Sequence, residues 1–175
     1  MKRGACALFV FATLATISLA QETPRAEIAV GGSVVEVLEG YTFRMYGGSG
    51  SVAWNVSDWL GIVGDFGVYH GHPGVSLTTD TYTVGPRFSY RHWDRVIPFG
   101  QILIGGVYAS AITTGFTGVS NAFAIGTGGG ADIKLDGRGR FALRPQMEYF
   151  SFRANGSTSN NARLSLGLVV RVGKK

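Results

Sequence analysis

The sequence predicts an all-β fold, an eight-stranded antiparallel up-and-down transmembrane β-barrel. Residues 81–91 alternate strictly, and apolar or aromatic residues fill every second position: Tyr82, Val84, Pro86, Phe88 and Tyr90. A period of two is typical of a β-strand, and about ten residues suffice for a tilted strand to cross a bilayer. Only 15% of the residues are charged, below the roughly 25% of soluble domains, and Gly is the commonest residue at 27. Beyond the N-terminal segment no apolar window reaches the length of a spanning helix, so any membrane crossing must use strands.

Residues 1–20 have the pattern of a cleaved secretory signal peptide, and residues 21–175 form one barrel domain. A basic start precedes an apolar run over residues 5–17, and Ser18-Leu19-Ala20 is a small-x-small cleavage site. The apolar run is too short to span a membrane as a helix. The only cysteine, Cys6, lies inside this segment, so the mature chain can form neither a disulfide nor a thiolate metal site.

The first three strands are expected at residues 26–35, 45–55 and 59–69. On the first, Ile28, Val30 and Val34 share one face and Glu27 lies on the other. The second places Tyr46, Val52 and Trp54 on its apolar face. The third places Leu60, Ile62, Phe66 and Val68 opposite Asp65. Each pattern fits a strand with one apolar and one polar side.

The last four strands, after the one at 81–91, are expected at residues 97–108, 122–135, 141–152 and 162–172. The fifth is the least regular, with Gln101 inward and Ile102, Ile104 and Tyr108 outward. The sixth sets Asp132 and Lys134 against Phe123, Ile125 and Ile133. The seventh sets Arg144 and Glu148 against Leu143, Met147 and Tyr149. The eighth is the most regular, with Leu164, Leu166, Leu168, Val170 and Val172 on one face and Arg163 and Arg171 on the other.

The connections between these strands alternate in length. Long polar loops are expected at residues 36–44, 70–80, 109–121 and 153–161. Short turns are expected at residues 55–58, 92–95 and 136–139. Short turns at one end and longer loops at the other are typical of transmembrane barrels, in which the short turns are periplasmic.

Three features favour an outward apolar face over a soluble, lipocalin-like barrel with an apolar interior. The polar face is rich in Gly, Ser, Ala and Thr, where a surface in water would be rich in Lys and Glu. The last strand lies near the C-terminus and can pair with the first, which removes the unpaired edges that hydrocarbon forbids. The aromatic residues collect at the strand ends, as in the two aromatic girdles of a membrane barrel: Tyr46, Tyr69, Tyr82, Tyr108, Phe123 and Tyr149 near the long loops, and Trp54, Trp59, Tyr90, Trp93 and Phe141 near the short turns.

An inward polar face would enclose charges that need partners or trapped water. We expect a structural charge network in the lumen formed by Glu27, Asp65, Arg87, Asp132, Lys134, Arg144, Glu148 and Arg163, with Arg91 and Arg171 also inward. Centring the hairpin at 136–139 on Arg138 places Asp132 directly opposite Arg144.

The chain resembles the small outer-membrane β-barrel proteins of the OmpA/OmpX type over its whole mature length. The resemblance rests on the alternating strands and on residues 82–91, 98–101 and 126–132. It implies export to the outer membrane, and as partners bilayer lipid, lipopolysaccharide and the outer-membrane assembly machinery, with a monomeric state. No nucleic-acid partner is expected, because the positive charges are spaced singly along the strands and form no Lys/Arg run or basic helix. Such proteins usually end on an aromatic residue that the insertion machinery recognises, whereas this chain ends Val170-Arg171-Val172-Gly173-Lys174-Lys175.

Three motifs point weakly to other chemistry. Residues 126–131 superficially match a dinucleotide-binding loop, but the sequence continues as a strand where that loop needs a helix. His70 and His72 could ligate a metal, although no third ligand is nearby in sequence. His70, His72 and Ser76 could serve a lipid A-modifying enzyme, although no spacing defines a triad.

We therefore expect an integral outer-membrane barrel with a structural or surface-interaction role, no enzymatic activity, no cofactor and no bound metal. Three alternatives stay open: a narrow pore for ions or small solutes, a lipid A-modifying enzyme, and a soluble ligand-binding barrel.

Overall fold

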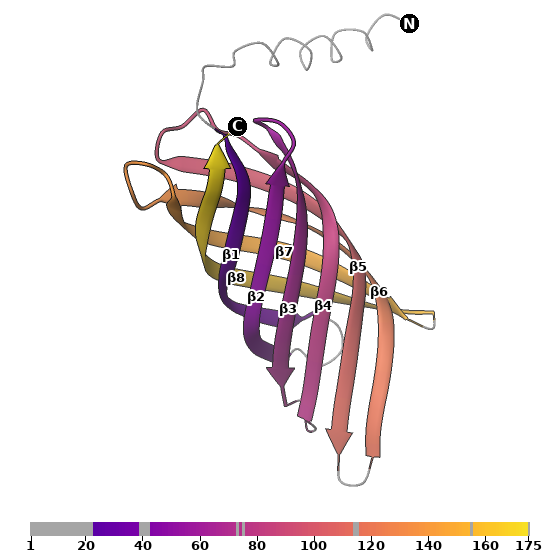
Figure 1. Cartoon of the computed structure of the whole chain (residues 1–175). Coiled ribbons are helices and arrows are strands. Elements are labelled where there is room, and N and C mark those ends of the chain that lie inside the picture. Colours follow the sequence, from indigo (N-terminus) through magenta and orange to yellow (C-terminus); the bar gives the residue numbers. More distant parts are fainter. Residues whose placement is uncertain are drawn as a thin grey trace, which may run out of the picture.

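The structure, a computed structural model, describes residues 23–38, 43–72, 74, 76–113, 116–154 and 156–174, and within them eight antiparallel strands form one closed barrel (Figure 1). The strands, in chain order, are β1 (Pro24–Val37), β2 (Phe43–Asn55), β3 (Leu60–Gly71), β4 (Ser76–Ser89), β5 (Val96–Thr113), β6 (Phe116–Lys134), β7 (Phe141–Ala154) and β8 (Ser157–Lys174). The predicted all-β, eight-stranded up-and-down barrel is confirmed. The predicted signal peptide lies outside the described residues.

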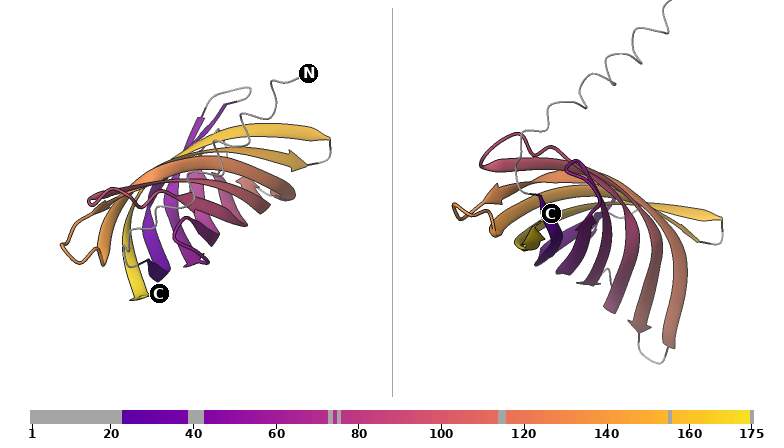
Figure 2. Two further views of the ribbon diagram at one scale, coloured as in Figure 1. Left: turned by 90° about the horizontal axis from the view of Figure 1, so that it is seen from above. Right: turned by 45° about the horizontal axis from the view of Figure 1, so that its top comes forward.

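Every strand pairs with its neighbour in sequence, and β8 pairs with β1 to close the barrel. The closing pair runs from Pro24 opposite Lys174 to Val37 opposite Asn161. Figure 2 shows β1 and β8 side by side as the strands wrap around a common axis. The predicted closure is therefore confirmed, and the sheet has no open edge at which backbone groups would lack partners.

The two ends of the barrel differ in their connections. At the end that we call the short-turn rim (upper end in Figure 1), the connections are residues 56–59, 90–95 and 135–140. At the opposite end, which we call the hairpin rim, the strands are joined through residues 38–42, 72–75, 114–115 and 155–156, and the β5–β6 hairpin reaches furthest in Figure 1.

The short turns occur where the sequence predicts them. In the turn after β6, the Gly139 amide donates to the Asp136 carbonyl at 3.0 Å and the Phe141 amide donates to Asp136 Oδ1 at 2.9 Å. Gly139 has a φ of 64°, a left-handed conformation that costs glycine little. In the turn after β2, the Leu60 amide donates to Ser57 Oγ at 3.1 Å.

The prediction of long polar loops at the other end was wrong. The segment 109–121 is almost entirely strand, and β5 and β6 stay paired until Thr113 lies opposite Phe116. Ala154 similarly lies opposite Ser157, and Gly156 in that connection has a φ of 81°. Strands pair through backbone groups, which does not require an apolar face. The Ser- and Thr-rich ends of these hairpins are therefore paired although they lack the alternation of apolar and polar residues by which a half-buried strand is predicted.

The side-chain distribution of the barrel is inverted relative to a water-soluble protein. Apolar side chains point outward and are exposed on every strand, including Val30, Val52, Phe66, Val84, Ile104, Ile125, Met147 and Leu166. Side chains of opposite parity point inward and include nine buried charged residues among those described. No helix in the described residues is long and apolar enough to span a membrane.

The glycine-rich stretch of β6 brings neighbouring strands close together. A Cβ atom added at Gly128 would collide with the Met147 carbonyl oxygen, and one added at Gly130 would collide with the Pro145 carbonyl oxygen, both on β7. The predicted strand in place of a dinucleotide-binding loop is confirmed, because these glycines permit backbone approach within a sheet.

Candidate functional site: the charged lumen

The interior of the barrel holds a charge network made of five arginines and four carboxylates. All nine belong to inward positions of six different strands or their ends and are buried: Glu27, Asp65, Arg87, Arg91, Asp132, Arg144, Glu148, Arg163 and Arg171. Because a buried charge without a partner is costly, the geometry of the pairs decides whether such an interior is stable.

The first group, which we call the Glu27 cluster, consists of Glu27, Asp132, Arg91, Arg144 and Arg171. Glu27 accepts hydrogen bonds from Arg91 Nη2 at 2.8 Å and from Arg144 Nη2 at 2.7 Å, one on each carboxylate oxygen. Asp132 accepts from Arg144 Nε at 2.6 Å and from Arg171 Nη2 at 2.8 Å. Arg144 therefore joins two carboxylates, and strands β1, β6, β7 and β8 are tied together near the short-turn rim.

The second group, which we call the Arg163 cluster, consists of Arg163, Asp65, Glu148 and Tyr69. Arg163 Nη1 donates to Asp65 Oδ1 at 2.8 Å and to the Tyr69 hydroxyl oxygen at 2.7 Å, while Nε donates to Glu148 Oε2 at 2.6 Å. Arg163 and Glu148 also form an ion pair through Nη2. Glu148 lies directly opposite Arg163 on the neighbouring strand β7, whereas Asp65 and Tyr69 reach Arg163 from β3, across the lumen.

Arg87 and Gln101 link the two clusters. Gln101 accepts from Arg87 Nε at 2.8 Å through Oε1 and donates through Nε2 to Glu148 Oε1 at 2.7 Å. Arg87 Nη1 lies 3.8 Å from Glu27 Oε2. The network is therefore continuous from the Glu27 cluster to the Arg163 cluster.

Two inward phenylalanines support the guanidinium groups. The Phe99 ring has the guanidinium carbons of Arg87 and Arg144 at 4.6 and 4.9 Å from its centroid, and the Phe150 ring has that of Arg163 at 4.9 Å. Such contacts stabilise a desolvated cation by about 2 kcal/mol or more.

The structure brings together seven of the eight residues that the sequence predicts for the lumen network. Asp132 and Arg144 are joined directly, and Gly130 opposite Gln146 and Ile133 opposite Leu143 give the register that the hairpin predicts. Lys134 departs from the prediction. It is half-buried near the short-turn rim and takes part in none of the ion pairs between described residues.

Of the residues predicted for the aromatic girdles, Tyr69 was placed wrongly. Its side chain is 1% exposed and its hydroxyl faces Arg163 inside the barrel, so it belongs to the lumen. On β3 the apolar outward face consists of even-numbered residues, and Tyr69 has the opposite parity. The other ten are exposed on the outer wall or at its rims: Tyr46, Trp54, Trp59, Tyr82, Tyr90, Trp93, Tyr108, Phe123, Phe141 and Tyr149.

Sequence reasoning missed the inward Phe99 and Phe150. Phe99 lies two positions before inward Gln101, and Phe150 lies two positions after inward Glu148, so strand parity alone places both inside. The arginine guanidinium groups beside the two rings explain why phenylalanines lie within a polar lumen.

The interior also holds apolar clusters and a small cavity. Near the hairpin rim, Val35, Met45 and Tyr69 form a buried apolar cluster against which Val37, Phe43 and Leu77 pack. Between β1, β2, β3, β7 and β8 lies a cavity of about 20 Å³, bordered by Ser51, Asp65 and Arg144. A volume of that size has room for about one water molecule.

The histidines singled out in the sequence lie away from this network. His70 Nδ1 is hydrogen-bonded to Thr78 Oγ1 at 2.9 Å across the β3–β4 pair. Across the described part of the chain, no group of three or more His, Cys, Asp or Glu side chains is placed to hold a metal ion.

Solved structures of several bacterial membrane and surface proteins share this fold. Neisserial surface protein A is 12% identical, with a TM-score of 0.73 over 83% of this chain and 96% of that one. Ail, the attachment invasion locus protein of Yersinia pestis, solved in complex with the heparin analogue sucrose octasulfate, is 17% identical, with a TM-score of 0.64 over 85% and 99%. The outer membrane protein OprG of Pseudomonas aeruginosa is 8% identical, with a TM-score of 0.59 over 87% and 98%.

Neither a protein-family model nor a curated protein matches the sequence. At these identities the likeness establishes the fold alone, and the roles of those proteins do not transfer to this chain. The resemblance to OmpA/OmpX-type barrels is confirmed at that level: the chain has the fold of the small outer-membrane β-barrels.

Proposed function

We propose that the chain is an integral, monomeric outer-membrane protein with a plugged lumen, whose work is structural or is done by its surface hairpins. One observation carries the proposal. In a closed barrel, the large apolar side chains are outside while the described charged network is inside and paired.

This distribution favours a bilayer over water as the solvent of the outer wall. A soluble monomer rarely exposes a contiguous apolar patch larger than a few hundred Å². Here exposed Val, Ile, Leu and Phe side chains encircle the barrel on every strand, and the exposed Trp54, Trp59 and Trp93 lie at the short-turn rim. An apolar band between aromatic girdles matches the hydrocarbon layer and its two interfaces.

The surface role rests on the hairpin rim. If the short-turn rim, which carries both chain ends, faces the periplasm, the β5–β6 and β7–β8 hairpins extend outward from the cell. Lipopolysaccharide would surround them, and the outer-membrane assembly machinery would be the partner during insertion. Ail, which shares the fold, has been solved with a heparin analogue bound, which supports testing these hairpins for surface contacts.

Fractionation of a Gram-negative host followed by gel electrophoresis tests the location and the fold together. We expect the protein in the outer-membrane fraction, with unheated and heated samples migrating differently because the closed barrel resists detergent. A protein that stays folded and monomeric in buffer without detergent would contradict the proposal.

A narrow pore and a lipid A-modifying enzyme are the rival functions. An eight-stranded interior is just wide enough to be filled by side chains, and the apolar cluster of Val35, Met45 and Tyr69 supports a closed lumen. We therefore expect the refolded protein to produce no steady conductance in a planar bilayer. A mass shift of lipid A upon expression, abolished by His72→Ala, would instead establish enzymatic activity.

A further inference from the structure

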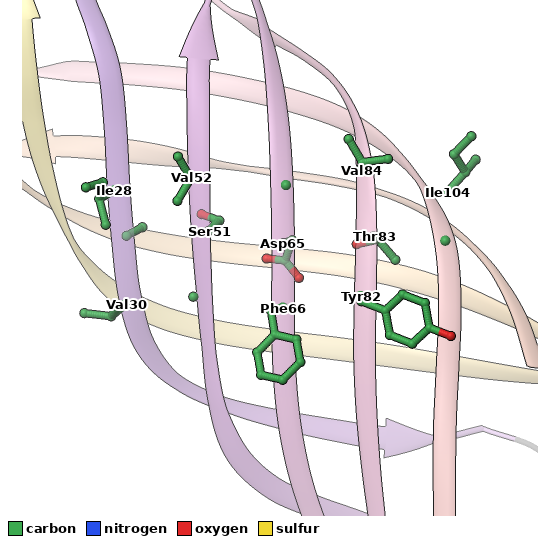
Figure 3. A pocket seen from close by; sticks show the side chains of 14 residues that line it. Ile28, Val30, Ser51, Val52, Asp65, Phe66, Tyr82, Thr83, Val84 and Ile104 are labelled. Atoms are coloured by element: carbon green, nitrogen blue, oxygen red, sulfur yellow. The ribbon is translucent and has the colours of Figure 1, made fainter. Parts of the chain in front are cut away.

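The outer wall carries a groove that the lumen network does not explain. It crosses the exposed faces of β1 to β5, has a volume of about 620 Å³ and is almost entirely apolar. In Figure 3, Ile28 and Val30 border one side and Tyr82, Val84 and Ile104 border the other. The volume lies within the range of roughly 300–1,000 Å³ that is usual for sites of small ligands.

Two glycines form the floor of this groove. Gly50 is paired with Val30 and Phe66, and Gly64 is paired with Val52 and Val84, so each lies between bulky outward side chains. A Cβ atom at Gly64 would meet nothing within 4 Å, which shows that the space above it is open. The depression is therefore a local absence of side chains in an otherwise continuous apolar wall.

A positive charge lies next to the end of the groove that is nearer the short-turn rim. The guanidinium carbon of Arg25 lies 5.1 Å from the centroid of the Trp54 ring. Trp54 is paired with Ala26 and lies one outward position nearer the short-turn rim than Val52, which lines the groove. A cation is thus held at the short-turn rim, next to that end of the groove, at the level of an aromatic girdle.

We propose that this groove binds one acyl chain of an anionic glycerophospholipid, whose headgroup phosphate is met by Arg25. The inference rests on the proposed membrane location, because only hydrocarbon chains reach the outer wall between the two girdles. Charge complementarity selects the occupant, since Arg25 attracts an anionic headgroup while the apolar groove beside it accepts the methylene groups of the acyl chain.

The test uses the full barrel in nanodiscs of mixed phosphatidylglycerol and phosphatidylcholine, extracted with mild detergent and weighed by native mass spectrometry. Gly64→Leu fills the groove, and Gly32→Leu is the matched control. Gly32 is also exposed, outward and free of contacts within 4 Å of an added Cβ, but it does not line the groove. Arg25→Gln removes the charge, and Arg25→Lys retains it.

We expect wild-type protein and the Gly32→Leu variant to retain one phosphatidylglycerol. The lipid-bound fraction should fall about tenfold in Gly64→Leu. Arg25→Gln should reduce the preference for phosphatidylglycerol about fivefold, while Arg25→Lys keeps it. Equal retention in Gly64→Leu and Gly32→Leu, or equal retention of the two lipids, would overturn the inference, as would a dimer that Gly64→Leu abolishes.

The gel-mobility shift of each inserted variant separates this proposal from the proposed function. If no variant inserts and shifts, both proposals fail. If all variants insert and shift but retain the same lipid, only the groove assignment fails.

Discussion

Glu27 is the carboxylate on which the charge network near the short-turn rim depends. It bonds Arg91 and Arg144 directly and has Arg87 and Arg171 within 4 Å, so it faces four of the five buried arginines. Its removal leaves several cations without their anion in a site closed to bulk water, and an uncompensated buried charge is strongly destabilising.

We therefore predict that Glu27→Gln lowers the free energy of unfolding by about 3–5 kcal/mol. The matched control is Glu36→Gln, because Glu36 pairs with Arg44 at 3.6 Å with the two side chains 37% and 60% exposed. A pair so exposed contributes about 1 kcal/mol or less. Urea unfolding in lipid vesicles, followed by Trp fluorescence, measures both, and equal effects would contradict the assignment of Glu27 to a closed network.

Substitution of Tyr69 tests whether its side chain belongs to the lumen network or to the outer aromatic girdle. Its hydroxyl accepts a bond from Arg163 at 2.7 Å, whereas the Tyr46 side chain is 60% exposed on the outer wall. A hydrogen bond to a charged group contributes about 1.5–3 kcal/mol, so Tyr69→Phe should cost that amount and Tyr46→Phe close to nothing. The same urea titration compares them, and a larger effect at Tyr46 would reverse the assignment.

Asp136, in the turn outside the membrane, should respond to pH. The hydrogen bond from the Phe141 amide holds the pKa of Asp136 below the ordinary aspartate value. A lowered pKa contributes stability that is present above the unfolded-state value and is lost as pH falls through the folded one. The Phe141 amide proton shift should therefore titrate with a midpoint below about 3.9. A midpoint at or above that value, or an unchanged titration in Asp136→Asn, would contradict this.

At the scale of elements, the close approach of β7 limits the size of the side chains that β6 can carry. The Cβ of a larger residue at Gly128 would meet the backbone of Met147, which cannot move without breaking the ladder. Gly128→Val should destabilise the barrel by about 1–3 kcal/mol or more, since overpacking forces a backbone shift. Gly32→Val, where nothing lies within 4 Å of the new Cβ, should be neutral or stabilising. The fraction of refolded protein on an unheated gel reports the difference, and equal yields would show that β6 has room to move.

The faces of the strands could be predicted from sequence, but their ends could not. On β8, Leu164 to Val172 alternate so regularly that parity alone assigns every side chain to the wall or the lumen. Beyond the apolar band that alternation ceases, while backbone pairing continues through Thr113 and Phe116. Pairing at those positions depends on the neighbouring strand, which a local pattern does not contain.

In the candidate site, only contacts between residues close together in sequence could be predicted. Asp132 and Arg144 lie on one hairpin, so the turn fixes their register and their contact. Arg163 reaches Asp65 and Tyr69 across the lumen, and that contact depends on how the closed barrel staggers its strands. Strand parity was enough to place Tyr69 in the lumen, but its contact with Arg163 depends on the stagger; its assignment to the girdle followed its residue type and was wrong.

For the molecule as a whole, the lipid-facing orientation makes a depth-dependent prediction. Leu166 and Val172 are 56% and 52% exposed, so water would tolerate a charge equally at both. Val172 is paired with Ala26, next to Trp54, at the girdle level, while Leu166 lies further along β8 toward its middle. In a bilayer, Leu166→Arg should cost about 2–4 kcal/mol and Val172→Arg about 0–1 kcal/mol. Reversible unfolding in vesicles measures both, and equal costs would contradict the orientation.

The pairing of β1 with β8 constrains how the molecule is made. Pro24 and Lys174 are neighbours in the sheet although nearly the whole chain separates them. A growing polypeptide can therefore not complete its hydrogen-bonded ring until its last strand has been synthesised, and contacts so distant in sequence form slowly. A chain truncated before β8 would leave the outer edges of β1 and β7 without hydrogen-bonding partners, an arrangement that hydrocarbon does not tolerate.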